Sequence, residues 1–459
     1  MCEPSVQVTT TDPAPEPRRR RLSVLGAMGW FAASYGGAVL GYLAINAFAA
    51  RMLETDFGYF VLAVTLSTLL GQLGLVGVHR GGLREAARMS AGDTEALGQL
   101  RRGVRAVSLV VLPLTTLVTV AATYLLVDAA DSETRWSLAI GMGGLVYLSG
   151  QQKLWANYLR GFGHVRFASL LEGRSGGAIA SALQGLGLGA LLLYRPEWGL
   201  AGALAAVAIG FLPPVIVGWL TVHRIWSASP GRGPLLRDSW TTTKKYWHFA
   251  ANLLGGYLNS TIELWIAAWL LTASGVSLFS AAQRLSVLLA LPLVSLGVVF
   301  SPVVARLVNH DSARLERLLR TAATLAALAA AVLWVPMLVA PEWLLVAIYG
   351  DLFGDAAPIL VLLTAGSIVN VLSGLCGTAL SMSHHERLVS VVQWVAVVLR
   401  VGAGCLAASQ FGAIGLGASA AIVTSGLYIA MWLLVRRRMG IYTHLTIRPS
   451  LRLLRQTSG

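Results

Sequence analysis

The sequence has few charged residues. Only 12% of its residues are charged, whereas soluble domains carry about a quarter. Its mean hydropathy is +0.67, and 56% of its residues are hydrophobic. These values exclude an ordinary soluble enzyme or binding domain and indicate a membrane protein.

Cysteine and catalytic motifs are also scarce. The three cysteines, Cys2, Cys376 and Cys405, exclude a disulfide framework. The sequence contains no Walker loop, no zinc-protease motif and no dinucleotide fingerprint in a strand-helix setting. We therefore expect no enzyme, no metal site and no cofactor, and consider a gradient of H+ or Na+ as the energy source.

The net charge of +14 does not indicate nucleic-acid binding. The Arg residues lie between apolar segments rather than on one basic face. Most of the 35 Lys and Arg residues fall in alternate connections, beginning with four consecutive Arg residues at 18–21. By the positive-inside rule, this bias predicts that both termini are cytoplasmic.

Twelve apolar segments approach the ~20 residues that a helix needs to cross a bilayer. Lipid offers the backbone no hydrogen-bond partners, so each segment must be a helix. The predicted fold class is therefore an all-α membrane protein with about twelve transmembrane helices. The predicted limits are 23–48, 57–79, 106–127, 136–158, 167–193, 198–222, 246–270, 276–304, 318–340, 357–383, 388–408 and 412–435.

The two halves of the sequence repeat one another at an offset of about 215 residues. A repeat of this length filled with hydrophobic spans indicates a two-lobed transporter whose binding site lies between the lobes. Three patterns recur: Gly-Tyr-Leu at 41–43 and 256–258, aromatic-Gly-x-x-Gly at 198–202 and 411–415, and Asp-x-x-x-Leu-x-x-Leu-x-Arg at 93–102 and 311–320.

Each half has six predicted helices, so the halves share one orientation and are related by a pseudo-two-fold axis along the membrane normal. From the spans we predict five regions. They are a disordered cytoplasmic N-terminus at 1–21, an N-lobe at 22–222, a cytoplasmic linker at 223–245, a C-lobe at 246–438 and a basic cytoplasmic tail at 439–459.

Charged residues within spans are candidate functional residues, because each costs at least ~2.5 kcal/mol near the centre of a helix. Six occur, and we predict cavity cations for four and coupling or ion-pair carboxylates for two. The cations are Lys153, Arg174, Arg284 and Arg400, and the carboxylates are Glu172 and Glu263.

The depths of these residues suggest two pairs. Lys153 and Glu172 lie at similar depths on adjacent helices, and so do Glu263 and Arg284. Each pair is either an ion pair that locks a hairpin or part of a transport site.

Arg174 and Arg400 have no such partner. Two unpaired guanidinium groups in a cavity suit an anionic ligand, because guanidinium binds phosphate oxygens in a bidentate fork.

Uncharged polar residues and small-residue motifs also occur inside the spans. Gly37-x-x-x-Gly41 and Gly185-x-x-x-Gly189 are typical of close helix contacts. The Asn and Gln side chains either bond neighbouring helices or line a wet cavity that accepts sugar hydroxyls. These residues are Asn46, Gln72, Gln151, Gln152, Asn157, Gln184, Asn252, Asn259, Gln283, Asn370 and Gln393.

An ordered series of diffuse motifs runs over about residues 22–440. It comprises the hairpin turn at 49–60, its counterpart at 275–285, Ser301-Pro302, Tyr349-Gly350, the Ala-Ala-Pro at 356–358, and 411–418. This series resembles the polysaccharide exporters, or Wzx-type flippases, of the multidrug/oligosaccharidyl-lipid/polysaccharide (MOP) superfamily. Arg284 matches a frequent position in this family, and Glu263 stands where many relatives have Asp.

The resemblance implies a V-shaped pair of six-helix lobes around a cationic cavity. It also implies movement of an undecaprenyl-pyrophosphate-linked oligosaccharide, a surface polysaccharide precursor, from the inner to the outer leaflet of the bacterial cytoplasmic membrane by alternating access. The partners expected on this basis are the lipid-linked substrate, membrane lipids and other membrane proteins of glycan assembly.

Two alternatives remain open at the level of sequence. One is a drug or cation antiporter of the same superfamily, which needs buried carboxylates to exchange ions against a cationic substrate. Cations within the spans outnumber acids four to two, which disfavours this reading. The other is a membrane enzyme of glycan assembly, which the short predicted connections disfavour.

Overall fold

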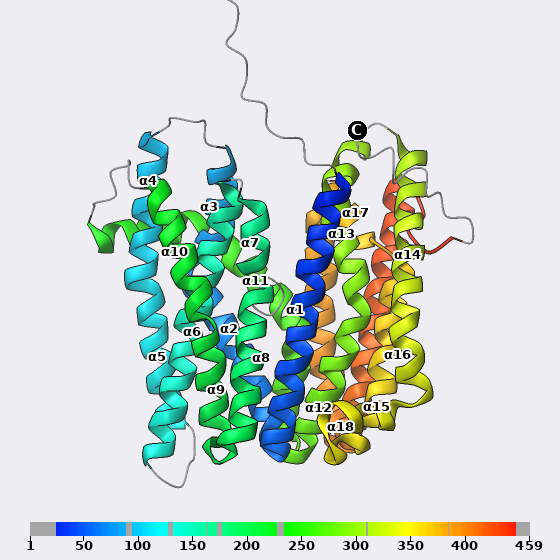
Figure 1. Ribbon diagram of the computed structural model, residues 1–459. Coiled ribbons are helices and arrows are strands. Elements are labelled where there is room, and N and C mark those ends of the chain that lie inside the picture. The colour runs from blue at the N-terminus through cyan, green and yellow to red at the C-terminus, as the bar shows by residue number, and fades with distance from the viewer. Residues whose placement is uncertain are drawn as a thin grey trace, which may run out of the picture.

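The computed structural model describes residues 24–88, 94–126, 132–162, 164–171, 177–226, 234–308, 311–383 and 385–446. These residues form helices and no strand, so the predicted all-α class is confirmed. Figure 1 shows the helices side by side in two groups, α2–α10 on the left and α12–α18 on the right, with α1 between them.

The described residues of the N-terminal half form ten α-helices and three short helical turns. They are α1 (Val24–Leu53), η1 (Glu54–Asp56), α2 (Phe57–Gly74), α3 (Val78–Arg88), α4 (Thr94–Ala106), η2 (Val107–Val111), α5 (Leu112–Leu126), α6 (Ser132–Gly161), α7 (Val165–Leu171), α8 (Gly177–Tyr194), η3 (Pro196–Trp198), α9 (Gly199–Gly210) and α10 (Leu212–Trp226).

In the C-terminal half, the part that the structure describes forms eight α-helices and two short helical turns. They are α11 (Leu235–Leu270), α12 (Ala273–Ser286), η4 (Val287–Ala290), α13 (Leu291–Leu307), α14 (Ser312–Val339), α15 (Pro341–Tyr349), η5 (Asp351–Ala356), α16 (Ala357–Ser373), α17 (Cys376–Met382) and α18 (Glu386–Met439).

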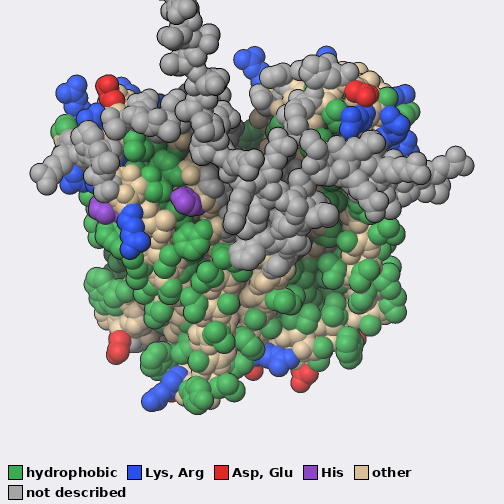
Figure 2. Space-filling view, turned by 45° about the horizontal axis from the view of Figure 1, so that its top comes forward, with side chains coloured by type: hydrophobic (Ala, Val, Ile, Leu, Met, Phe, Trp, Pro, Cys, Tyr) green, Lys and Arg blue, Asp and Glu red, His purple; other side chains and the backbone are tan. Residues whose placement is uncertain are grey.

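Eight stretches of the described chain are long and apolar enough to cross a membrane. Two of them contain a double crossing: 36–74 turns at η1, and 387–439 breaks at Gly412. The long helices α6 and α11 carry more polar residues and complete the twelve crossings predicted from the sequence. Figure 2 shows the resulting belt of hydrophobic side chains, with charged side chains gathered above and below it.

The internal repeat is visible in the backbone. Gly199 and Gly412, which occupy equivalent positions in the two halves, share an unusual conformation (φ 49°, ψ −142° and φ 61°, ψ −144°) that only glycine adopts readily. Three residues later, a Cβ on Gly202 or Gly415 would lie 2.6 or 2.7 Å from the Cβ of the preceding aromatic residue. The two halves therefore enter their last span through the same turn.

Small residues bring α1 and α8 together, as the two glycine motifs predicted. A Cβ on Gly41 would lie 2.5 Å from the Cβ of Ser181, and a Cβ on Gly185 would lie 3.4 Å from that of Ala44. Such close backbone approach is how helices associate where no hydrophobic effect drives them together.

The buried side chains form one core shared by both halves and two separate cores. The shared core joins Phe60 of α2 to Phe279 of α12 at the end of the molecule that holds η1 and η5, which we call the closed end. At the opposite end, which carries the basic connections and which we call the basic end, the C-terminal core around Leu318 is separate from the N-terminal core around Tyr158. The halves therefore share a hydrophobic core at the closed end, whereas at the basic end their cores are separate and α11 provides contacts between them.

A set of inter-half contacts at the closed end, which we call the seal, comprises Phe57, Gly58, Ser277, Tyr349 and Phe353. Phe57 is fully buried, and its ring lies 5.9 Å from that of Tyr349 and 5.7 Å from that of Phe353. The Ser277 hydroxyl accepts a 2.8 Å hydrogen bond from the Gly58 backbone N–H. The seal blocks passage through this end in the observed conformation.

Helix α11 contacts both halves. Near its start, Lys245 forms a 2.7 Å ion pair with Glu85 of α3, and Tyr246 belongs to the N-terminal core. Further along, Glu263 pairs with Arg400 of α18.

The stretch predicted as a linker, 223–245, contains the end of α10, the start of α11 and the undescribed residues 227–233.

The residues that follow α18 lie against the C-terminal half. Thr443 is fully buried, and its hydroxyl donates to the Ser373 carbonyl oxygen (2.8 Å). The Thr446 backbone N–H donates to the hydroxyl of Thr324 on α14 (2.9 Å). The first part of the predicted tail is thus docked. Residues 447–459 and the predicted disordered segment 1–21 lie outside the described residues.

The contact between α1 and α8 gives a test of the small-residue interface. We expect Gly41→Ala to lower the free energy of unfolding by about 1–3 kcal/mol, because the added methyl group overlaps Ser181. Gly36→Ala is the matched control, since no atom lies within 4 Å of its Cβ. Thermal unfolding in detergent measures both, and equal stabilities would contradict the close packing.

Candidate binding cavity

A cavity of about 550 Å³ lies between the two halves. Its walls come mainly from α1, α2, α6 and α8 of the N-terminal half and from α11 and α12 of the C-terminal half. The deeper wall includes Phe60 and Leu264, which belong to the core that closes one end. The cavity therefore occupies the position between lobes that the internal repeat predicted.

The charged residues among those that line the cavity are Arg80, Lys153 and Arg284, and no Asp or Glu is among the described lining residues. These three cations come from three different elements, α3, α6 and α12. A cleft with charges of one sign and low-dielectric walls attracts ligands of the opposite sign. The cavity is thus suited to an anion, and Lys153 and Arg284, two of the four residues predicted as cavity cations, are among its lining residues.

Arg284 reaches across the cavity from α12 to the N-terminal half. Its Nη2 donates to the Thr65 hydroxyl (2.8 Å) and to the Val61 carbonyl oxygen (3.4 Å), and its Nη1 donates to the Tyr42 hydroxyl (3.3 Å). The guanidinium carbon also lies 5.7 Å from the centre of the Tyr42 ring. The Arg284 Nε is buried without a hydrogen-bond partner in the described chain. All the acceptors of Arg284 are therefore neutral.

Several uncharged polar residues line the same space. Both alternatives predicted for these residues are seen together, because Gln184 donates to the Val207 carbonyl oxygen (3.0 Å) and Gln152 to the Leu171 carbonyl oxygen of neighbouring helices, while both also line the cavity. Five residues from the predicted set contribute: Asn46, Gln72, Gln152, Gln184 and Gln283.

Among the lining residues that were not predicted as site residues, three are aromatic or charged and face the cavity with a polar group. Arg80 lies in the predicted connection between the spans 57–79 and 106–127, whose basic residues entered the topology prediction, and it lines the cavity from α3. Tyr42 and Tyr257 both line the cavity, one from each half. The repeated Gly-Tyr-Leu pattern contained this signal, because it places the two tyrosines at equivalent positions of α1 and α11.

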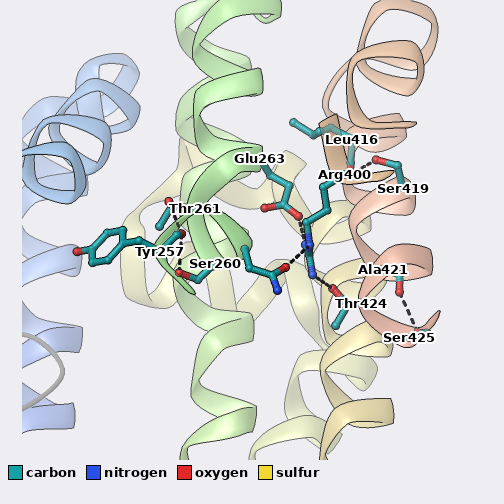
Figure 3. Close-up of polar contacts among 11 residues, drawn as sticks. Tyr257, Ser260, Thr261, Glu263, Arg400, Leu416, Ser419, Ala421, Thr424 and Ser425 are labelled. Carbon is teal, nitrogen blue, oxygen red and sulfur yellow. Dashed lines mark hydrogen bonds and ion pairs between the residues drawn. The ribbon is translucent and has the colours of Figure 1, made fainter. Parts of the chain in front are cut away.

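Arg400 has a carboxylate partner, contrary to the sequence prediction. It is only 7% exposed and pairs with Glu263, which is 3% exposed. Its Nε also donates to Asn259 (3.0 Å), and its Nη2 donates to Thr424 (2.8 Å). Figure 3 shows Arg400 directed from α18 toward Glu263 on α11 and toward Thr424.

The predicted pairing of Glu263 with Arg284 is wrong, because Glu263 pairs with Arg400 instead. The prediction compared the depths of residues only on helices that are neighbours in sequence, whereas Glu263 and Arg400 are 137 residues apart. Tyr257 points from α11 in a different direction from Glu263 (Figure 3). Helix α11 therefore separates the cavity from a buried ion pair, and neither Glu263 nor Arg400 lines the cavity.

Two predicted site residues, Glu172 and Arg174, lie outside the described residues. The pairing of Lys153 with Glu172 and the role of Arg174 as a cavity cation stay predictions.

Solved structures share this fold. A multidrug resistance MATE family transporter of the MOP superfamily in its inward-facing conformation aligns with a TM-score of 0.68 and 17% identity over 88% of this chain and 94% of that chain. An outward-facing conformation from the same family and superfamily gives a TM-score of 0.53 at 16% identity over 92% and 97%. The chain thus has the MATE fold and agrees better with the inward-facing of these two structures.

A third structure with this fold is a MOP superfamily transporter from Pyrococcus furiosus, described as having a binding pocket of reverse polarity. It aligns with a TM-score of 0.53 and 17% identity over 92% of this chain and 97% of that chain. No protein-family model matches the sequence, and no curated protein matches it. The comparisons therefore establish the fold.

The buried ion pair yields a prediction about stability. We expect Arg400→Met to cost about 3–5 kcal/mol, because it leaves the Glu263 carboxylate buried without a countercharge. The double variant with Glu263→Met should lose much less, since it leaves neither charge unpaired. Thermal unfolding of the purified proteins compares them. An equal loss in the single and double variants would show that the two charges are not coupled.

Proposed function

We propose that this protein moves an anionic, lipid-linked oligosaccharide across a membrane by alternating access. The observation that carries the proposal is the cavity between the halves, lined by Arg80, Lys153 and Arg284 and by no described carboxylate. A pyrophosphate group supplies the negative charge that such a cavity attracts. The proposed cargo is an undecaprenyl-pyrophosphate-linked precursor of a surface polysaccharide, as the resemblance to Wzx-type flippases implies.

The chemistry of the lining supports this cargo. Guanidinium and ammonium groups form charge-assisted hydrogen bonds with phosphate oxygens that are about twice as strong as bonds between neutral groups. The surrounding amides, including Asn46 and Gln72, offer partners for sugar hydroxyl groups. Such a transporter must also expose its cavity to each side in turn. The seal at the closed end and the separate cores at the basic end fit one of these two states.

The second candidate is a drug or cation antiporter, which the MATE transporters among the similar structures favour. A cationic substrate needs negative charge in the cavity, and the described lining supplies none. Glu263, one of the two predicted coupling or ion-pair carboxylates, lies outside the lining and is paired with Arg400. The Pyrococcus furiosus transporter is described as having a binding pocket of reverse polarity and a different function, which supports the view that this fold does not fix the cargo.

We further propose that the basic end faces the cytoplasm of a bacterial cell, with both termini on that side, because Lys and Arg collect in its connections. An ion gradient or the membrane potential is the proposed energy source, since the sequence has no nucleotide-binding motif. Partners from glycan assembly would supply the cargo at this face. A membrane enzyme is disfavoured, because no catalytic set is recognisable in the sequence.

The proposal predicts that cavity cations are required for transport. We expect Lys153→Met or Arg284→Met to reduce the rate of lipid-linked oligosaccharide translocation about tenfold or more, the equivalent of one lost bond to a charged group. Proteoliposomes that contain a fluorescent undecaprenyl-pyrophosphate saccharide measure the rate.

Arg195→Met is the matched control, because Arg195 is exposed and paired with Glu197 away from the cavity. If both cavity variants translocate the lipid as fast as this control, an anionic cargo bound by these residues is excluded.

A further inference from the structure

Arg284 is both a cavity residue and a bond between the two halves. It is anchored on α12, and the three acceptors of its guanidinium group all belong to α1 or α2. The same helix holds Ser277 of the seal, seven residues before Arg284 and therefore about 10 Å along the helix. The floor of the cavity and the seal are thus connected through one short helix.

Helices α2 and α12 pack closely beside Arg284, so the two halves cannot separate there while these helices stay in contact. A Cβ on Gly58 would lie 2.6 Å from Val276 Cγ1 and 2.7 Å from the Ser277 backbone nitrogen. Helices α2 and α12 therefore touch at the seal, and Thr65 lies two turns further along α2, where Arg284 binds it. Separation of α2 from α12 must break both the Ser277 contact and the Arg284 contact.

We propose that Arg284 is a latch that keeps the empty protein closed at the seal, and that an anion in the cavity opens the latch; this rests on the proposed function for the identity of the cargo. The latch bonds are the two from Nη2 to Thr65 and Val61 and the one from Nη1 to Tyr42.

The geometry of guanidinium makes anion binding and the latch compete. A bidentate grip on phosphate oxygens uses either Nε with Nη2 or Nη1 with Nη2, so Nη2 takes part in both. Both Nη2 hydrogens are already used by Thr65 and Val61. A pyrophosphate bound in either way therefore takes at least one donor from α2. The new bond is stronger, because its acceptor is charged whereas the acceptors on α2 are neutral.

The state of the seal can be read with a buried cysteine. Val276→Cys places a thiol at a fully buried position of the seal region, and Ala356→Cys gives a second reporter on η5. Both are introduced into a chain in which Cys2, Cys376 and Cys405 are replaced by Ser. The rate of labelling by a soluble maleimide, measured on the purified protein in lipid nanodiscs, then reports how often the seal opens.

Thr65→Val and Thr68→Val form a matched pair for the latch. Both hydroxyls line the cavity on α2 and donate to their own helix, but only Thr65 accepts a bond from Arg284. We expect Thr65→Val to label severalfold faster than the parent without any added ligand, and Thr68→Val to label like the parent. Tyr42→Phe, which removes the other hydroxyl, should act in the same direction. If Thr65→Val labels no faster than Thr68→Val at both reporters, the latch is disproved.

Inorganic pyrophosphate is the probe for anion release. It should accelerate labelling of the parent and of Thr68→Val relative to chloride at equal ionic strength, but have little further effect on Thr65→Val. If pyrophosphate does not accelerate labelling of the parent, the proposal that an anion opens the latch is disproved. The comparison of Thr65→Val with Thr68→Val involves no cargo, so it tests the latch separately from the proposed function. If the latch proposal is disproved, the translocation assay with Lys153→Met still tests the proposed function.

Discussion

The guanidinium group of Arg284 lies between two helix bundles, and every acceptor it has among the described residues is neutral. A charge in this environment is costly, and proteins usually offset the cost with a carboxylate. Arg400 follows that rule through Glu263, whereas Arg284 has no carboxylate partner among the described residues and faces the cavity. The contrast between these two arginines separates a structural ion pair from a candidate binding residue.

The duplication explains how one chain builds such a cavity. Equivalent turns at Gly199 and Gly412 start the last span of each half in the same way. Equivalent tyrosines, Tyr42 and Tyr257, face the cavity from opposite sides. The charged residues do not follow the repeat, since the three lining cations come from α3, α6 and α12. The scaffold is therefore symmetric, whereas the charge that decides the cargo is not.

Much of this organisation could be predicted from the sequence, because the membrane restricts the choices. Apolar length predicted the helices, the repeat predicted two halves, and Gly37-x-x-x-Gly41 predicted a close helix contact, which the structure shows with α8. The partners of charged residues were harder to predict. Arg400 meets Glu263 only because α11 and α18 pack side by side, and one sequence contains no information on that contact. Arg80 was interpreted as a topology signal, because a basic residue at the end of a span looks the same in the sequence whether it orients the protein in the membrane or binds a ligand.

A fold does not fix the substrate of a transporter, so the charge of the cavity decides between the two candidate functions. The most direct test is equilibrium binding to the purified protein of an undecaprenyl-pyrophosphate-linked saccharide and of a lipophilic cation of similar apolar area, each over a range of salt concentrations. The cationic cavity predicts that the pyrophosphate lipid binds, that salt weakens its binding, and that the lipophilic cation does not compete. Tight binding of the cation at the cavity, with no binding of the pyrophosphate lipid, would contradict the account.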